Sequence, residues 1–239
     1  MIGIIIQART GSRRFPKKIY EDINGKYTLQ RVLEGCTASQ IPHKIILAMP
    51  KYDEIEFTER RENGDFARFI DSRFDTYFGS PDDLMDRYFQ AARKFGISTI
   101  VRITADCPLI QGSLIDEMVC DYLKNGYNGF CSNIYTVSKA PYPCGISVEI
   151  FPYWMLAEAC QLTKDPIHRE HVTPFMYRRG TSYTIHSFDN HRPNPIISNR
   201  FADFSFDTPE DLVMIKAICE GYDRHGNLDM AIRDAKYGS

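Results

Sequence analysis

The chain lacks several features that would place it in a specialised class of protein. Its 239 residues contain no apolar run long enough to span a bilayer, and no charged segment precedes the first apolar run as in a secretory signal. The cysteines are odd in number, scattered and without a Cys-x-x-Cys pair: Cys36, Cys107, Cys120, Cys131, Cys144, Cys160 and Cys219. This pattern favours reduced thiols over a disulfide framework or a zinc site. We therefore expect a cytoplasmic protein without membrane insertion.

An excess of charge of either sign is also missing. With 29 basic and 31 acidic residues the formal net charge is -2, which disfavours general binding to nucleic acid. Hydrophobic residues make up 43% and charged residues 25%, as in ordinary globular proteins. No repeat or low-complexity segment divides the chain, so the sequence predicts a single domain over residues 1–239.

Residues 2–18 combine a buried strand with a basic loop. The segment from Ile2 to Ala8 is almost continuously apolar, which is typical of a strand buried on both faces. From Arg9 to Lys18, five of the ten residues are cationic and none is acidic. Gly11 and Ser12 would let the backbone approach a ligand, so the loop is a candidate cradle for a polyphosphate. A solvated basic turn is the alternative, and the loop alone does not decide between them.

Strands and helices alternate along the first half of the chain. We predict strands at 2–8, 44–49, 76–78 and 98–104, and helices at 27–39, 54–70, 80–94 and 113–124. Ile55 is expected on the inner face of the second helix. Short connections between these elements indicate an α/β fold with a mostly parallel central sheet covered on both faces, a Rossmann-like three-layer sandwich.

The pattern changes in the second half to short extended pieces separated by turns. We interpret residues 134–200 as an insertion on one side of the sheet, with a small antiparallel element and exposed aromatics suited to an interface. Helices are expected there at 151–163 and 169–179, and a strand at 182–188. Residues 202–206 then return to a core strand, followed by two helices.

Two acidic residues follow predicted strands that end at the same edge as the basic loop. Asp106 follows the strand at 98–104, and Asp207 follows the strand at 202–206. Sheets of this type bind ligands outside the carboxyl ends of their strands, where the loop also lies. Two carboxylates facing cationic side chains suit a magnesium nucleotide, because Mg2+ prefers carboxylate, phosphate and water oxygens.

Simpler explanations exist for several of these acidic residues. Asp106 has the alternative of accepting hydrogen bonds from backbone amides in a turn. Glu210 and Asp211 are explained by the start of a helix and receive no catalytic role. Asp207 is not needed for that helix start, so it stays available for a ligand.

Two further groups of residues have structural explanations. Asp82, Asp83 and Asp86 are typical of a solvated helix face, and the alternative is that their helix start lies near the nucleotide. His168 and His171 are three apart and would share a helix face, but no third ligand accompanies them, so a metal site there is disfavoured.

Five motifs lie in order along nearly the whole chain: Ile-Ile-Gln-Ala-Arg-Thr-Gly-Ser-x-Arg-x-Pro-x-Lys at 5–18, Gly-Ser with Leu-x-Asp-Arg-Tyr at 79–88, Val-Arg-Ile-Thr-Ala-Asp-Cys-Pro-Leu-Ile at 101–110, Arg-Glu-His-Val-Thr-Pro at 169–174, and Asp-Thr-Pro-Glu-Asp-Leu at 207–212. Together they resemble the SpsF-like cytidylyltransferases, which are related to the CMP-sialic-acid and CMP-KDO synthetases. The chain departs from that pattern at Arg13, where a small hydroxyl residue is common, and at Lys17, where glycine is common. Both departures add charge without removing a motif residue.

The resemblance implies a nucleotidyltransferase that moves CMP from CTP to an acidic sugar or similar acceptor and releases pyrophosphate, with Mg2+ and as a homodimer. Carried over residue by residue, it assigns catalysis to Lys18, Arg14 and Asp106, and the metal to Asp106 and Asp207. It assigns nucleotide binding to Ala8, Arg9, Gly11, Ser12, Arg14, Lys18, Ser80 and Thr104. It assigns acceptor binding to Gly145, Glu149, Glu170 and His171, and the insertion is expected to form the dimerisation and acceptor element.

We therefore expect a CTP-dependent cytidylyltransferase in the biosynthesis of surface polysaccharides or other glycans. One alternative is a nucleotide-sugar glycosyltransferase on a related sheet, but such enzymes generally present an Asp-x-Asp pair, and Asp106 stands without that partner. Another is a non-catalytic nucleotide-binding protein, against which the intact Lys18, Asp106 and Asp207 argue. The residues specify neither the acceptor nor the strictness of the preference for CTP.

Overall fold

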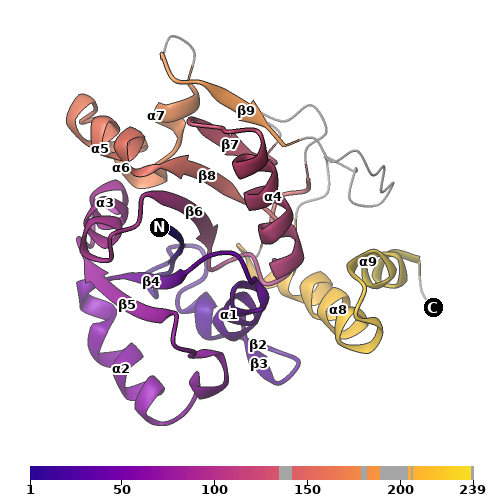
Figure 1. Cartoon of the computed structure of the whole chain (residues 1–239). Helices are drawn as coiled ribbons and strands as arrows, with labels where there is room; N and C mark the ends of the chain where they lie inside the picture. Colours follow the sequence, from indigo (N-terminus) through magenta and orange to yellow (C-terminus); the bar gives the residue numbers. More distant parts are fainter. Residues whose placement is uncertain (135–141, 179–181, 189–203, 206, 238–239) are drawn as a thin grey trace.

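The computed structural model describes residues 1–134, 142–178, 182–188, 204–205 and 207–237. Within these ranges, a mixed sheet of seven strands runs through the centre of the molecule in the order β5-β4-β1-β6-β8-β7-β9 (Figure 1). Its strands are β1 (Ile2–Gln7), β4 (Lys44–Pro50), β5 (Phe74–Gly79), β6 (Thr99–Thr104), β7 (Phe130–Ser132), β8 (Glu149–Pro152) and β9 (Ile185–Ser187). β8 is antiparallel to both of its neighbours, and the other neighbouring strands are parallel. β2 (Asp22–Ile23) and β3 (Lys26–Tyr27) form a separate hairpin.

Helices cover both faces of this sheet (Figure 1). One face carries α1 (Thr28–Ala38), α4 (Gly112–Lys124), α8 (Pro209–His225) and α9 (Leu228–Tyr237), and Phe57 of α2 (Glu54–Glu62) joins the same apolar core. The other face carries α3 (Leu84–Lys94), α5 (Tyr153–Leu162), α6 (Pro166–His171) and α7 (Pro174–Tyr177). Three short 3-10 helices complete the described elements: η1 (Lys18–Tyr20), η2 (Lys51–Asp53) and η3 (Ala67–Phe69).

β1 shows why this sequence forms three layers. Side chains of a strand alternate between the two faces of the sheet. Ile4 and Ile6 pack into the core beneath α1 and α4, whereas Ile5 packs into the core beneath α3 and α5. All three side chains are fully buried. The structure thus confirms the predicted α/β class and its mostly parallel sheet.

The predicted helix at 54–70 is too long. α2 ends at Glu62, and the chain turns at Gly64, which has φ 89°. Ile55 is 73% exposed, so its expected place on the inner face is wrong. Residues two apart are rotated by about 200° around a helix, and Phe57 occupies the buried side instead.

Part of the range predicted as an insertion belongs to the central sheet. β8 pairs with β6 on one side and β7 on the other, so Phe151 and the following proline extend a strand, and α5 begins only at Tyr153. The strand predicted at 202–206 falls mostly outside the described residues. Phe204 and Ser205, which are described, lie in no strand.

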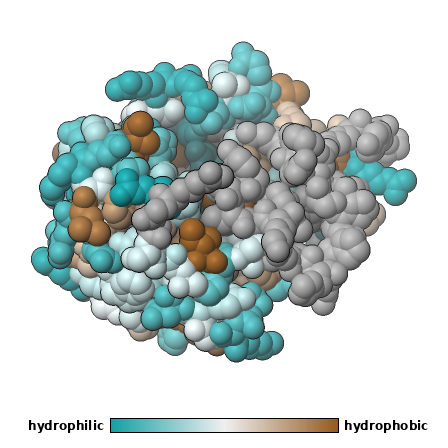
Figure 2. Space-filling view, turned by 90° about the horizontal axis from the view of Figure 1, so that it is seen from above, coloured by the Kyte–Doolittle hydropathy of each residue, from teal (hydrophilic) through white to brown (hydrophobic). Residues whose placement is uncertain are grey.

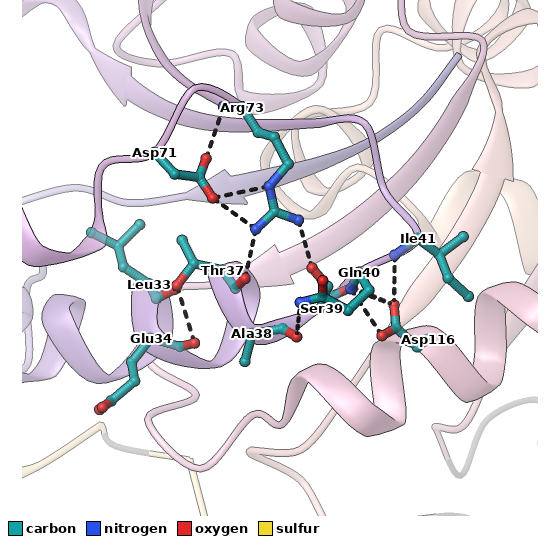
Figure 3. A network of polar contacts seen from close by, with 10 residues as sticks. All are labelled: Leu33, Glu34, Thr37, Ala38, Ser39, Gln40, Ile41, Asp71, Arg73 and Asp116. Carbon is teal, nitrogen blue, oxygen red and sulfur yellow. Dashed lines mark hydrogen bonds and ion pairs between the residues drawn. The ribbon is translucent and has the colours of Figure 1, made fainter.

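Asp116 of α4 fastens the connection between α1 and β4. Its carboxylate accepts hydrogen bonds from Ser39 Oγ at 2.6 Å and from the next two backbone nitrogens at 2.9 and 3.1 Å (Figure 3). On the other side of this turn, Arg73 donates to the backbone carbonyls of Thr37 and Ser39. These bonds satisfy polar groups that the end of α1 leaves without helical partners, and they anchor the amino ends of β4 and β5.

Exposed apolar side chains are scattered over the described surface. Ile55, Leu162, Ile167, Val213 and Met230 belong to five different helices. Figure 2 shows one face, where the hydrophobic residues that are coloured stand apart among hydrophilic ones. Within the described ranges, no helix combines the length and apolar character needed to cross a membrane.

Replacing Asp116 tests this account of the α1–β4 connection. In Asp116→Ala, two partly buried donors and one exposed donor lose their acceptor, so we expect the free energy of unfolding to fall by about 1–3 kcal/mol. Urea denaturation measures the change. Asp121→Ala on the same helix is the matched control, because among the described residues the Asp121 carboxylate accepts only an exposed bond from Asn125. Equal, small losses in both variants would contradict the account.

Candidate active site

The basic loop leaves β1 at the carboxyl edge of the parallel strands. β1 lies between β4 and β6, so the loop follows the centre of this half of the sheet. Asp53, which is buried, accepts hydrogen bonds from the Thr10 backbone nitrogen at 3.0 Å and from the Thr10 hydroxyl. A Cβ at Gly11 would lie 2.8 Å from the Tyr52 hydroxyl oxygen, so the loop passes that ring closely. These contacts hold the loop in one shape.

Lys17 adopts a left-handed backbone conformation with φ 57°. This conformation costs residues other than glycine roughly 1–2 kcal/mol. The backbone therefore explains why glycine is common at this position in the family that the sequence resembles. The Lys17 ammonium is 3.0 Å from Glu56, so it takes part in a different ion pair from Lys18.

Lys18 lies at the meeting point of three segments that are far apart in the sequence. Its Nζ is 3.0 Å from Asp106 Oδ2 and 2.8 Å from Asp207 Oδ1. Arg14 Nη2 lies 2.7 Å from the other oxygen of Asp207. The Lys18 side chain is buried, while both carboxylates are partly open to solvent. The loop and the two aspartates thus lie together. For Asp106, which follows β6, this is what the strand-end argument predicts, whereas the described residues just before Asp207 lie in no strand.

The charges of this cluster stabilise one another. Burial lowers the pKa of Lys18, but Asp106 and Asp207 more than compensate, so the pKa of Lys18 is raised. Burial also disfavours the ionised form of Asp106, yet Lys18 and a hydrogen bond from Thr104 hold the Asp106 pKa below its ordinary 3.8. Lys18 and Asp106 are therefore both charged at neutral pH.

The start of α8 holds the backbone of Asp207. Asp211 accepts hydrogen bonds from the backbone nitrogens of Asp207 at 3.0 Å and Thr208 at 2.8 Å. The Thr208 hydroxyl accepts in return from the Asp211 nitrogen, which completes a capping box. Asp211 thus has the structural role expected from the sequence, and it leaves the Asp207 carboxylate to face Lys18.

A cavity of about 440 Å³ opens beside Asp106. Its lining includes three of the four residues predicted to bind the acceptor: Gly145, Glu149 and His171. Gly145 has φ 86°, and a Cβ there would lie 2.2 Å from the carbonyl carbon of Phe204, so only glycine fits. Glu170, the fourth residue, lies outside the lining and forms an ion pair with Arg9 across 3.7 Å.

α6 forms a second ion pair, in addition to that of Glu170 with Arg9, and this one joins it to the start of α3. Arg169 donates to the Asp83 carboxylate from Nε at 2.8 Å and also from Nη2. Asp83 caps α3 by accepting from the Asp86 backbone nitrogen. The interpretation of Asp83 as part of a solvated helix face is therefore wrong, because its carboxylate is shared between a cap and an ion pair.

The turn between α6 and α7 is strained. Val172 has φ 68°, which a β-branched residue rarely adopts, and the Thr173 nitrogen donates to the His171 carbonyl at 2.8 Å. This turn places both His171 and Thr173 on the cavity wall. His168, three residues before His171, does not line the cavity. Its ring nitrogen lies 2.9 Å from the Thr163 hydroxyl.

The predicted nucleotide-binding residues fall into two groups. Most share the loop after β1: Ala8, Arg9, Gly11, Ser12, Arg14 and Lys18. Thr104 borders the cavity at the end of β6. Ser80 follows β5, which β4 separates from β1, and its hydroxyl accepts a hydrogen bond from the Asp83 nitrogen at 3.1 Å. The described contacts do not join Ser80 to the Lys18 cluster.

Cys107 borders the same cavity but is not a nucleophile. Burial and the Asp106 carboxylate raise the pKa of Cys107 to about 12, and the Thr104 hydroxyl lies 2.9 Å from its sulfur. The thiol therefore stays protonated at neutral pH, and thiolates rather than thiols attack electrophiles.

Reasoning from the sequence missed Asp53, Arg102 and Thr173 as parts of the site. Arg102 is the one charged residue in the predicted strand Ser98–Thr104. A lone charge among the uncharged residues of a strand is a signal that could have pointed to the site. Asp53 offered no such signal, because an acidic residue before a helix also fits a cap. Thr173 acts through a partner on β8 that only the fold brings near.

Comparison with known proteins identifies the family of the chain. The family model described as Cytidylyltransferase matches residues 3–225. The chain belongs to the cytidylyltransferase family. It is accordingly an enzyme of nucleotidyl transfer, and the resemblance drawn from the five motifs is confirmed.

Relatives of this cytidylyltransferase include proteins of different organisms. The uncharacterized protein MJ1063 of Methanocaldococcus jannaschii is 32% identical over 186 residues, which cover 77% of this chain and 70% of that protein. The spore coat polysaccharide biosynthesis protein SpsF of Bacillus subtilis is 24% identical over 220 residues, or 91% of this chain and 85% of SpsF.

Solved structures share the architecture. A cytidylyltransferase from Leptospira borgpetersenii has a TM-score of 0.79 at 26% identity, covering 98% of this chain and 92% of that one. A CMP:2-keto-3-deoxy-manno-octonic acid synthetase complexed with CTP has a TM-score of 0.65 at 16% identity, covering 92% and 98%. The second likeness concerns the fold alone.

The ion pairs of Lys18 predict how stability depends on pH. The pKa of Asp106 is lower in the folded protein than its ordinary 3.8, so its contribution is present above that value and is lost as pH falls below it. We expect Asp106→Asn to flatten the fall in the free energy of unfolding between about pH 5 and pH 2. Urea titrations across this range measure the slope, with Asp82→Asn, at an exposed site, as the control. A slope unchanged from the wild type would contradict the assignment.

Proposed function

We propose that this cytidylyltransferase transfers CMP from CTP to an acidic sugar or related acceptor and releases pyrophosphate. The observation that supports this most strongly is the Lys18 ammonium between Asp106 and Asp207, because Asp106 also lines a cavity the size of a small-molecule site. An acceptor oxygen would attack the α-phosphorus of CTP, forming one P–O bond while the bond to the β-phosphate oxygen breaks. The acceptor loses a proton, and pyrophosphate leaves.

The loop after β1 would hold the triphosphate. Arg9, Arg14 and Lys18 provide cations, and the backbone around Gly11 and Ser12 can approach the phosphates closely. Because Lys18 is buried next to the end of β6, it is placed to stabilise the negative charge that develops on the leaving pyrophosphate. Arg14 and Lys18 would exchange carboxylate partners for phosphate oxygens.

Asp106 and Asp207 would hold Mg2+. Their oxygens converge on one nitrogen, so both carboxylates can reach a single small ion, and Mg2+ often takes only one or two protein ligands. When bound, the ion would neutralise phosphate charge and orient the α-phosphate. The described residues contain no cluster of three or more metal-binding side chains, and the two carboxylates suffice for this mode of binding.

The cavity beside Asp106 would receive the acceptor. Gly145, Glu149 and His171 lie on its wall, while Glu170 would act at its rim through Arg9. Thr104, which also borders the cavity, would contact the nucleotide near the α-phosphate. Ser80 is proposed to contact the nucleoside end of CTP, since it lies beyond β4.

The biological setting is also part of the proposal. SpsF is a polysaccharide biosynthesis protein, so the products of this enzyme would enter the synthesis of surface polysaccharides or other glycans. The resemblance supports a homodimer built on the insertion at 134–200 of a single domain. All seven cysteines are free thiols, which is consistent with a cytoplasmic location.

Neighbouring lysines provide a matched test of the catalytic assignment. We expect Lys18→Met to lower the rate of pyrophosphate release from CTP by roughly 100-fold or more, because it removes a cation that stabilises the leaving group. Lys17→Met removes a similar charge that is bound to Glu56, so its rate should stay within a few-fold of the wild type. The assay uses Mg2+ and a panel of eight-carbon and nine-carbon sugar acids.

The same assay tests the carboxylates. Full activity in an Asp106→Ala plus Asp207→Ala variant would end the metal assignment. Thermal unfolding of each variant without ligand separates a loss of fold from a loss of chemistry.

A ligand screen tests the choice of nucleotide. A ligand that binds only the native state at a hundredfold excess over its Kd adds about 2.7 kcal/mol of stability, which raises Tm by roughly 5–10 °C in a chain of this size. We expect CTP with Mg2+ to give the largest increase, compared with UTP, ATP and GTP. Equal increases in Tm with all four nucleotides would contradict the expected preference for cytosine. No increase with any of them would contradict the proposed function.

A further inference from the structure

The cavity beside Asp106 contains an ion pair that is separate from the Lys18 cluster. Arg102 of β6 and Glu149 of β8 are direct partners across the two strands, and both line the cavity. Their side chains are only 14% and 5% exposed, and an Arg102 nitrogen donates to Glu149 Oε2. Burying two charges is costly even when they pair, and apolar residues would often serve stability as well. A ligand in the cavity would explain why the pair is there.

Both carboxylate oxygens of Glu149 already have partners. One of its oxygens accepts from Arg102, and the other accepts from the Thr173 hydroxyl at 2.9 Å. An acceptor that contacted Glu149 would have to share these oxygens with Arg102 and Thr173. Its contacts instead fix the position of Arg102 and of the strained turn that carries Thr173.

Arg102 still has donors available. Its Nε donates to Gln7 Oε1 at 3.1 Å, and Nη1 donates to Glu149. The Tyr88 hydroxyl bonds to the same oxygen of Gln7 at 3.3 Å. The other terminal nitrogen of Arg102 makes no hydrogen bond within the described part of the chain. The guanidinium is therefore held on two sides and has one edge left for a ligand in the cavity it lines.

The position of Arg102 suits one end of an acceptor whose other end reacts. Arg102 and Thr104 point to the same face of β6, and two residues of strand span about 7 Å. Thr104 and Asp106 lie where the α-phosphate is expected. A molecule the size of a sugar can span from this point to Arg102 within a cavity of about 440 Å³.

We propose that Arg102 binds an oxyanion of the acceptor (a carboxylate, phosphonate or phosphate) and that Glu149 is a positioning residue for Arg102. This inference rests on the proposed function and names the group that the same site recognises. The planar guanidinium fork matches oxyanions and discriminates them from neutral hydroxyls better than a lysine would. The structure thus changes the expected role of Glu149 from contact to support.

Steady-state kinetics of variants separate these roles. Arg102→Gln should raise the KM for the acceptor by roughly tenfold to hundredfold, the range expected when a charged hydrogen bond is lost, and leave the KM for CTP within about twofold. Arg102→Lys should recover part of the loss. Glu149→Gln should raise the acceptor KM less than Arg102→Gln does. Lys44→Gln is the matched control, because it breaks another ion pair on the sheet, Lys44 with Asp75, whose residues lie on β4 and β5 outside the cavity lining.

The acceptor probes are 3-deoxy-manno-octulosonate, 2-aminoethylphosphonate and glycerol 3-phosphate, each compared with the neutral sugar mannose. Their binding to the wild type is first measured by calorimetry with Mg2+ and α,β-methylene CTP, which cannot release pyrophosphate. The probe that binds identifies the kind of oxyanion. Tight binding to the wild type that Arg102→Gln weakens supports the proposal.

Three outcomes would overturn it. If a probe binds or reacts and Arg102→Gln leaves its Kd and KM unchanged, Arg102 is not the anchor, while the proposed function stands. If the CTP analogue binds but mannose binds as well as every charged probe, or none of the probes binds, oxyanion recognition is wrong and nucleotide binding stands. If the CTP analogue itself does not bind, the proposed function is wrong, and the inference that rests on it falls as well.

Discussion

The site depends on one buried ammonium group shared between two carboxylates. Lys18 comes from the loop after β1, Asp106 from the end of β6, and Asp207 from the segment before α8. Without the lysine, the two carboxylates would repel each other and the loop would lose its inner contact. The ion pairs of Lys18 therefore do two things: they hold the loop against the edge of the sheet, and they bring the charged groups of the site together.

The other cations around the site follow the same principle. Arg14 is bound to Asp207, Arg9 to Glu170, and Arg102 to Glu149. Each pair neutralises a charge that would otherwise repel its basic neighbours, so a dense group of cations can exist in a chain with a net charge of -2. Under the proposed function, a triphosphate would then bind by exchanging partners with these cations rather than by filling an empty basic pocket.

Much of this was predictable because it depends on local patterns. The uninterrupted apolar run from Ile2 predicted a strand buried on both faces, and Ile4, Ile5 and Ile6 indeed serve two cores. Alternating strands and helices predicted a parallel sheet, whose carboxyl edge then had to bring together the basic loop and Asp106. The motifs predicted the family because catalytic groups recur at fixed positions along such chains.

The sequence by itself determined the class of fold, the family and the residues that carry charge at the strand ends. Only the tertiary structure decided which charges are partners: Asp53 with Thr10, Asp83 with Arg169, and Glu149 with Arg102. It also placed β8 inside the central sheet and turned Ile55 toward solvent. Periodicity specifies which face of an element is apolar, whereas the pairing of polar groups depends on distances between segments that become neighbours only when the sheet forms.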